Sequence, residues 1–86
     1  MDRYLLRYFL AVAELGSFSK AAARVSVTQP TLSVGIAKLE DELGARLFER
    51  TTRRVSLTPA GSRFLAHARR ITQEYEAALR EVSETP

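Results

Sequence analysis

The sequence predicts a mainly α-helical domain of three helices, a two-stranded hairpin and a fourth, longer helix. Three observations lead to this expectation. Apolar residues recur at helical spacing in the first, third and last long segments. The ending Glu-Leu-Gly occurs twice, at Gly16 and Gly44, and glycine readily takes the left-handed conformation that follows a helix. After Gly44 the pattern changes to short runs typical of strands. A chain of 86 residues should form one domain with a single small core.

The first predicted helix ends at Gly16 and carries two adjacent apolar stripes. The stripes comprise Leu5, Phe9 and Val12, and Leu6, Leu10 and Ala13. The second helix is short, about two turns, and lies in the stretch SFSKAAARVSV. Either Ser17 or Ser19 could cap it, and we expect Ser19 because good helix formers follow directly from Lys20 to Arg24.

The third predicted helix spans about residues 29–43 and opens with the uncharged stretch VTQPTLS. Thr28 is the expected N-cap, and Pro30 falls in the first turn, where its missing N–H costs nothing. One narrow stripe at helical offsets predicts a buried face, formed by Leu32, Ile36, Leu39 and Leu43. On the opposite side lie Pro30, Val34, Ala37 and Lys38, with Thr31 and Ser33 on the two shoulders.

A hairpin and a long helix follow. Leu47-Phe48 and Val55-Ser56-Leu57 predict two short strands, with Thr51 to Arg54 as a basic tip. Thr58 then caps a helix whose heptad-like seam comprises Phe64, Ala68, Ile71, Tyr75, Ala78 and Val82, flanked by Leu65, Thr72 and Leu79. We expect the first part of this seam to pack on the first helix and the far half to pack on a second chain. The alternative is a solitary, exposed helix end.

The charge is unevenly distributed along the chain. Residues 1–70 hold 12 basic and 6 acidic side chains, whereas residues 71–86 hold Arg80 against four glutamates. Between residues 45 and 70 seven arginines face only Glu49. A localised basic patch indicates a polyanionic partner, and the alternative is an ordinary solvated surface.

Composition argues against several classes of function. Without cysteine, and with His67 as its only histidine, the chain offers no disulfide, no thiol nucleophile and no zinc site. We also find no carboxylate pair in a likely cleft, no glycine-rich phosphate loop and no nucleophile–base pair, so we expect neither an enzyme nor a cofactor or metal. Residues 40–42 and His67 are interpreted as solvated positions. With no secretory signal and no apolar run of the roughly 20 residues that a membrane helix needs, the expected location is the cytoplasm.

Two helices joined by a tight turn and followed by a basic hairpin are typical of a winged helix-turn-helix. In such folds the start of the second helix enters the major groove, where hydroxyls and amides can bind bases or phosphates at short range. We assign Thr28 to capping, and Gln29, Thr31 and Ser33 to DNA contact, because capping needs only one of them. Positive charge would come from the flanks: Lys20, Lys38, Arg50, Arg53 and Arg54.

The sequence resembles the N-terminal DNA-binding domain of LysR-type transcriptional regulators, which are bacterial. The motifs GSFSKAA, TQPTLS, LEDELGARLFER and LTPAG carry the resemblance in this order, and it covers essentially the whole chain. It implies a winged helix-turn-helix in residues 1–58 and a linker helix in residues 59–86. It also implies a homodimer through antiparallel linker helices. Full-length members carry an effector-sensing domain that is absent from this chain, so no small-molecule effector is expected to bind here, and tetramers are expected only with that domain.

The resemblance also implies roles for individual residues. Gln29, Pro30, Thr31 and Ser33 should lie at the major groove, and Arg53 should reach phosphates or the minor groove, with Arg50 and Arg54 close by. The expected dimer interface comprises Phe64, Ala68, Ile71, Tyr75, Ala78, Leu79 and Val82.

Two positions depart from the family pattern. Many members carry long polar residues where this chain has Val34 and Gly35. Val34 could contact only a thymine methyl, so direct readout should be thinner here or shifted towards A·T-containing steps. Gly35 costs a helix about 1 kcal/mol relative to alanine, and close backbone approach to DNA or to the second helix would explain it. A different class of function, a protein-interaction module that uses the helical seam, stays as the alternative.

Overall fold

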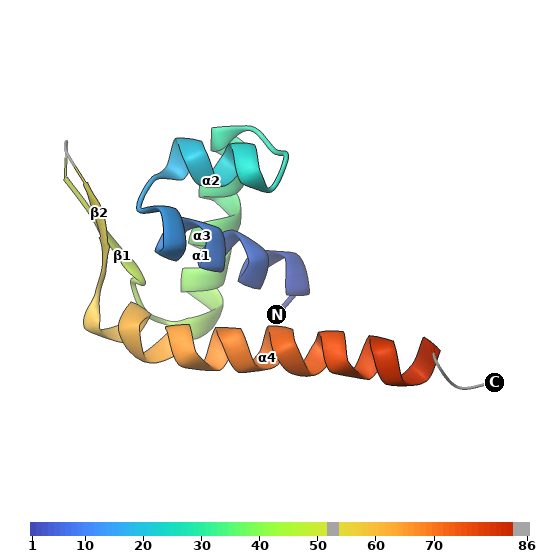
Figure 1. Ribbon diagram of the computed structural model, residues 1–86. Helices are drawn as coiled ribbons and strands as arrows, with labels where there is room; N and C mark the ends of the chain where they lie inside the picture. Colours follow the sequence, from blue (N-terminus) through green and yellow to red (C-terminus); the bar gives the residue numbers. More distant parts are fainter. Residues whose placement is uncertain (52–53, 84–86) are drawn as a thin grey trace.

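The computed structural model describes residues 1–51 and 54–83, which form four helices and one antiparallel hairpin (Figure 1). Their order along the chain is α1 (Arg3–Leu15), α2 (Phe18–Arg24), α3 (Gln29–Leu43), β1 (Phe48–Arg50), β2 (Val55–Leu57) and α4 (Pro59–Ser83). Helices α1, α2 and α3 pack together, the hairpin extends to one side, and α4 runs beneath α1 and projects past it (Figure 1). The predicted mainly α-helical winged helix-turn-helix with a long final helix is confirmed.

The ends of α1 and α3 are set by the two predicted glycines. Gly16 and Gly44 adopt left-handed conformations, with φ of 62° and 68°. The Gly16 N–H donates to the Val12 carbonyl at 2.8 Å, and the Gly44 N–H donates to the Asp41 carbonyl at 3.3 Å. Glycine takes this conformation without the steric cost that a Cβ would bring, so both helices stop where the sequence predicts.

The core lies where α1, α3 and the start of β1 meet. Its largest fully buried side chains are Phe9, Leu5, Leu32, Ile36, Leu39, Leu47 and Val12. The prediction of a buried stripe on α3 is confirmed for Leu32, Ile36 and Leu39 and wrong for Leu43, which is 37 % exposed. Leu43 occupies the last turn of α3, just before the chain leaves the helix at Gly44.

Aromatic rings join four elements around this core. The Phe9 ring of α1 lies 5.3 Å from that of Phe48 in β1 and 5.0 Å from that of Phe64 in α4. The Phe48 ring also meets Phe18 of α2, at 6.0 Å with an edge-on angle of 77°. Such pairs stabilise a fold by about 0.5–1.5 kcal/mol each beyond the burial of their area. The cluster therefore fixes the hairpin and α4 relative to the helix-turn-helix.

The hairpin pairs Phe48 with Leu57, Glu49 with Ser56 and Arg50 with Val55. The Thr51 N–H closes it by donating to the Arg54 carbonyl at 2.9 Å. The predicted hairpin is confirmed, with the second strand as predicted and the first beginning at Phe48 and not at Leu47. Thr52 and Arg53 at the predicted basic tip lie outside the described residues.

The start of α4 is bonded to the segment that leads into the hairpin. The Thr58 hydroxyl accepts from the Gly61 N–H at 3.0 Å and donates to the Arg46 carbonyl at 2.5 Å, while the Thr58 N–H donates to the Leu47 carbonyl at 3.0 Å. Thr58 therefore caps α4 as predicted, and its hydroxyl satisfies two backbone groups at once. A Cβ on Gly61 would lie 2.1 Å from the Leu47 carbonyl oxygen, so only glycine fits this approach.

Candidate nucleic-acid interface

The first turn of α3 is held by Thr28, as predicted. The Thr28 Oγ1 accepts from the Thr31 N–H at 3.3 Å and also donates to the Thr31 hydroxyl at 3.0 Å. Pro30 occupies the first turn without loss of a helical hydrogen bond. The helix therefore begins at Gln29 with a fixed backbone, and its first side chains project from a rigid element.

The outer face of α3 is exposed along its length, as the helical wheel predicts. Val34 is the most open of the large apolar residues here, at 69 % exposed. Ser33 is half-buried on a shoulder of the helix. The other exposed positions on this face and its first turn are Gln29, Pro30, Thr31, Ala37 and Lys38.

Helix α2 contributes a polar edge next to this face. Ser17, and not Ser19, caps α2: the Ser17 Oγ accepts from the Lys20 N–H at 3.1 Å. The expectation for Ser19 is wrong because α2 begins at Phe18, two residues earlier than a Ser19 cap would allow, and the core buries the Phe18 ring. The Ser19 hydroxyl donates instead to the Gln29 Oε1 at 3.1 Å. Lys20, the next residue, is exposed.

The hairpin brings two arginines close to the same region. The Arg50 guanidinium carbon lies 3.6 Å from the centre of the Phe18 ring, which is a close cation–π contact. Arg54 is exposed, and its backbone is fixed by the hydrogen bonds to Thr51. A shallow cleft of about 300 Å³ separates the hairpin from the starts of α2 and α3, and its lining includes Ser19, Gln29, Arg50 and Arg54.

Four cations of α2, α3 and the hairpin have no acidic partner among the residues that the structure describes: Lys20, Lys38, Arg50 and Arg54. The ion pairs found in those ranges join the N-terminus to Glu42, Arg24 to Glu14 and Arg46 to Glu40. None of them involves Lys20, Lys38, Arg50 or Arg54. These four side chains therefore keep their positive charge available for a polyanion.

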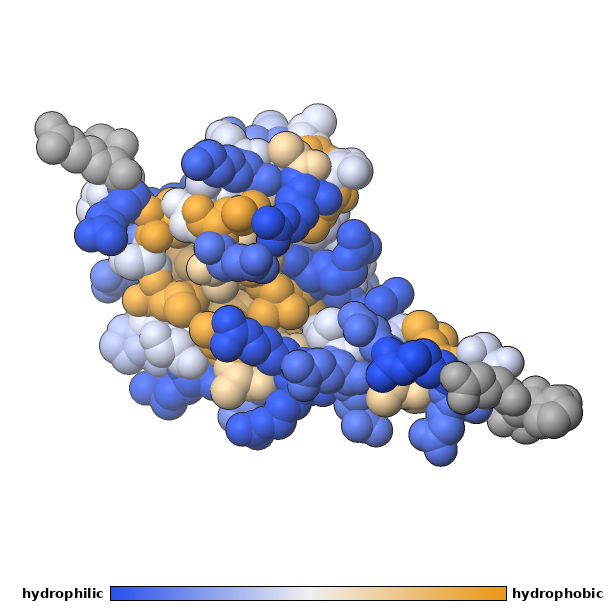
Figure 2. All heavy atoms as spheres, viewed as in Figure 1, coloured by the Kyte–Doolittle hydropathy of each residue, from blue (hydrophilic) through white to orange (hydrophobic). Residues whose placement is uncertain are grey.

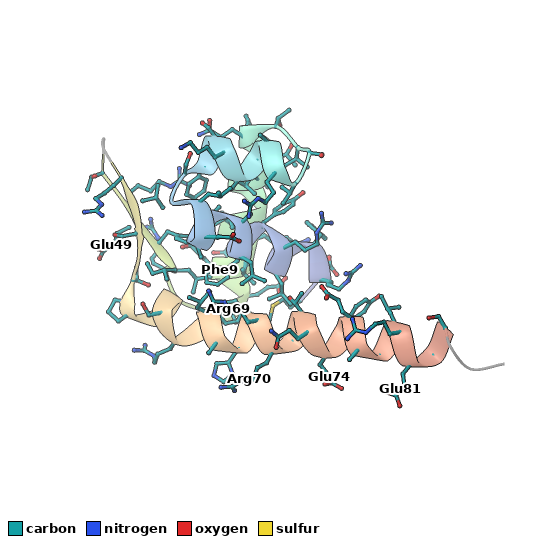
Figure 3. The ribbon with its side chains drawn as sticks, viewed as in Figure 1. Phe9, Glu49, Arg69, Arg70, Glu74 and Glu81 are labelled. Carbon is teal, nitrogen blue, oxygen red and sulfur yellow. The ribbon has the colours of Figure 1, made fainter. Side chains whose placement is uncertain are left out.

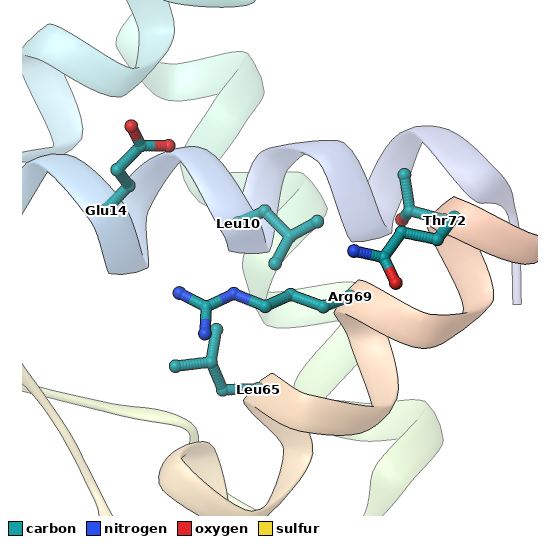
Figure 4. Close-up of a pocket in the computed structure, with 6 residues that line it drawn as sticks. Leu10, Glu14, Leu65, Arg69 and Thr72 are labelled. Atoms are coloured by element: carbon teal, nitrogen blue, oxygen red, sulfur yellow. The ribbon is translucent and has the colours of Figure 1, made fainter. Parts of the chain in front are cut away.

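The described arginines between residues 45 and 70 lie on more than one surface of the molecule. Arg46 pairs with Glu40 at 3.7 Å. Figure 3 places Arg70 on the opposite side of α4 from Arg69, and Arg69 lies in a groove of about 280 Å³ between α1 and α4 (Figure 4). The helical period therefore places Arg69 and Arg70 on different sides of α4, whereas Arg50 and Arg54 lie together at the cleft beside the hairpin.

Glu40 and Gly35 of α3 have structural roles that could not be predicted from the sequence. Glu40 is not a solvated residue: its side chain is 15 % exposed, and its Oε2 accepts from the Leu47 N–H at 2.7 Å. Gly35 faces α1, where a Cβ would lie 2.6 Å from the Tyr8 Cδ2. Neither DNA nor the second helix explains this glycine, because α1 occupies the space beside it.

The seam of α4 divides into two parts. Ala68 is fully buried, and Phe64 packs against the Phe9 ring in the protein's own core. The apolar side chains beyond them are exposed: Ile71, Tyr75, Leu79 and Val82 are 44 %, 42 %, 52 % and 74 % exposed. Ala78 is also exposed. Figure 2 shows an apolar group on this far part of α4, among polar side chains.

Other kinds of site find no support in the described ranges. They hold no cluster of three or more potential metal ligands. None of the described helices combines the length and apolarity that a membrane span requires. His67 is exposed on α4, as predicted.

The chain matches the family described as bacterial regulatory helix-turn-helix protein, lysR family, over residues 4–62. It is 56 % identical over 66 residues to the uncharacterized regulator YnfL of Escherichia coli, covering 77 % of this chain and 22 % of that protein. It is 53 % identical over 71 residues to the regulator TfdT of Cupriavidus pinatubonensis, covering 83 % of this chain and 31 % of that protein. The chain thus spans less than a third of these curated relatives, both of which are named as transcriptional regulators rather than enzymes.

Solved structures agree with this match over almost the whole chain. The DNA-binding domain of CbnR in complex with DNA superposes with a TM-score of 0.93 at 40 % identity, covering 96 % of this chain and 95 % of that one. The DNA-binding domain of BenM bound to benA site 1 DNA gives 0.91 at 40 % identity, with 96 % and 93 % covered. The chain therefore belongs to the lysR family of bacterial regulatory helix-turn-helix proteins and corresponds to their DNA-binding domain.

Proposed function

We propose that the chain binds double-stranded DNA in a sequence-specific manner, with the first half of α3 in the major groove and the hairpin beside it. The observation that carries this proposal is the outer face of α3. It is exposed, begins with uncharged polar side chains, and is flanked by cations that have no acidic partner within residues 1–51 and 54–83. An α-helix fits the major groove, which is about 12 Å wide.

The contacts divide into two kinds. We assign base readout to Gln29, Pro30, Thr31, Ser33 and Val34, which lie in the first two turns of α3. We assign the DNA backbone to Arg50 and Arg54 at the cleft, to Lys20 of α2 and Lys38 of α3, and to Arg53 from the sequence pattern. Two DNA complexes of similar domains support DNA binding by this fold, since each superposes on 96 % of the chain.

We further propose a homodimer through the far part of α4. Its exposed apolar stripe comprises Ile71, Tyr75, Ala78, Leu79 and Val82, which continues the seam that α1 covers nearer the helix start. Phe64 and Ala68 are left out of this interface because the chain's own core occupies them. Two α4 helices packed antiparallel would cover both stripes and place two α3 helices on one duplex. We place this activity in the bacterial cytoplasm, with residues 1–58 as the DNA-reading part and residues 59–86 as the linker helix.

The proposal is tested by selection from a pool of random duplexes at near-physiological salt. The expected result is an enriched inverted repeat whose half-sites lie about one or two helical turns apart. The affinity for that repeat should fall with salt at a slope of about −0.9 per phosphate neutralised, in log–log form. Failure to retain any duplex, or a slope near zero, would contradict the proposal and favour a protein-interaction module.

A further inference from the structure

The side chain of Gln29 is held by a residue on another helix. The Ser19 Oγ donates a hydrogen bond to the Gln29 Oε1 at 3.1 Å across ten residues of chain. Ser19 lies in the first turn of α2, and Gln29 is the first residue of α3. Both side chains are exposed, and both line the cleft beside the hairpin. The bond therefore joins the two helices at the surface that we propose to face DNA.

The Ser19 hydroxyl is available for this bond because α2 does not need it. Ser17 already caps α2 through the Lys20 N–H. Buried neighbours also fix the positions of Ser19 and Gln29. Phe18, next to Ser19, is buried against Phe48 and lies under the Arg50 guanidinium. Leu32, one turn after Gln29, is fully buried. The distance between Ser19 and Gln29 is thus set by packed helices and not by a loop.

The direction of the hydrogen bond determines what Gln29 can offer to a base. A serine hydroxyl has one proton, and here it goes to the amide oxygen. The Gln29 Nε2 keeps two N–H donors, for which the described residues provide no partner. An amide fixed in this way presents donors, whereas a freely rotating amide offers its oxygen to a base just as readily. The held amide therefore suits acceptors in the major groove: guanine O6 and N7, adenine N7 and thymine O4.

We propose that Ser19 is a specificity-determining positioning residue, which orients the Gln29 amide so that its donors select an acceptor edge. Guanine is the preferred base, because it alone presents two adjacent acceptors in the major groove. Ser19 acts through Gln29 and not by touching a base. This inference rests on the proposed function, since it assigns the chemistry by which one residue of the same surface reads DNA.

The test compares the chain with Ser19→Ala, Ser19→Thr, Gln29→Ala and the double variant Ser19→Ala/Gln29→Ala. Each is titrated against four duplexes that carry the four possible pairs at the position whose preference Gln29→Ala alters. The chain itself should prefer guanine there. Ser19→Ala should reduce that preference about three- to tenfold, the range expected for one hydrogen bond, with a smaller effect on total affinity. Ser19→Thr keeps the hydroxyl and should keep the preference, and Ser19→Ala should have no further effect once Gln29 is alanine.

A matched control is Ser83→Ala, which removes a hydroxyl at the far end of α4 and should change nothing. Thermal melting of each variant separates loss of folding from loss of selectivity. An unchanged preference in Ser19→Ala, or an equal loss in Ser19→Thr, would overturn the inference. So would a uniform loss on all four duplexes that persists in the Gln29→Ala background, because Ser19 would then contact the DNA backbone itself. If the unaltered chain retained no duplex at all, the proposed function would fail, and this inference with it.

Discussion

Val34 lies at the centre of the surface that we propose to read DNA. It is 69 % exposed, with Thr31 one turn before it and Lys38 one turn after it on the outer face of α3. It has no hydrogen-bonding group, so its only means of distinguishing bases is apolar contact, and thymine presents a methyl group in the major groove.

This assignment predicts a specific effect of the thymine methyl. Replacing single thymines of the selected operator by uracil should weaken binding of the chain about fourfold at one step, because burying one such carbon is worth about 0.8 kcal/mol. The Val34→Ala variant should lose most of this sensitivity. Titration of each substituted duplex checks it, and equal losses for both proteins would contradict a contact through Val34.

At the scale of single residues, the sequence predicted the local cap at Thr28 and missed the residues whose partners lie far away. Thr28 caps its own helix, so its role could be predicted from three neighbouring residues. Ser19 and Glu40 bond to Gln29 and to the Leu47 backbone, ten and seven residues further on. Gly35 faces Tyr8 of another helix. Helical periodicity carries no information on such contacts until the helices are packed.

Among the elements, α3 and the hairpin are joined by the Glu40 carboxylate. We predict that Glu40→Ala lowers the free energy of unfolding by about 1–3 kcal/mol, because the Leu47 N–H loses its acceptor in a partly buried site. Glu40→Gln retains an acceptor oxygen and should cost less. Urea denaturation of the two variants checks the order, and an equal cost would show that charge and not hydrogen bonding matters here.

Replacing Gly35 or Gly61 by alanine should lower the free energy of unfolding by different amounts. In Gly35→Ala the new Cβ meets the Tyr8 ring, which can move, so we expect a loss of about 1 kcal/mol after the gain in helix propensity. In Gly61→Ala the Cβ meets the backbone carbonyl of Leu47, which is held by its bond to Thr58. We expect a loss of about 3 kcal/mol or more there. Chemical denaturation measures both, and the reverse order would show that α4 can shift at its start.

The existence and order of the elements could be predicted because strong local signals mark them. The two glycines end α1 and α3, Thr28 and Thr58 open α3 and α4, and the strands follow short apolar runs. The exposure of Leu43 could not be predicted, because the stripe on α3 is longer than the core that it packs against. A periodic pattern shows which face is apolar and not how far the neighbouring helix extends.

At the scale of the whole molecule, the exposed apolar stripe on the far part of α4 predicts a dimer. Leu79→Glu places a charge in the exposed stripe and should convert the proposed dimer to a monomer, which sedimentation equilibrium measures. The fold should survive, since Leu79 is 52 % exposed. Ala66→Glu adds the same charge at an exposed position of α4 away from the stripe and serves as the control. A dimer that persists in Leu79→Glu would show that α4 does not form the interface.

The attachment of α4 at both ends of its buried part has a mechanical consequence. Its start is bonded through Thr58, and the Arg3 guanidinium of α1 lies 4.1 Å from the centre of the Tyr75 ring. With 25 residues at 1.5 Å each, α4 is a lever about 38 Å long. A tilt of about 5° at its start would move its far end by roughly 3 Å, close to the 3.4 Å rise of one base pair. In the proposed dimer, the angle between α1 and α4 would therefore set the distance between the two half-sites. Releasing Arg3 from Tyr75 would widen the range of half-site separations that the dimer accepts.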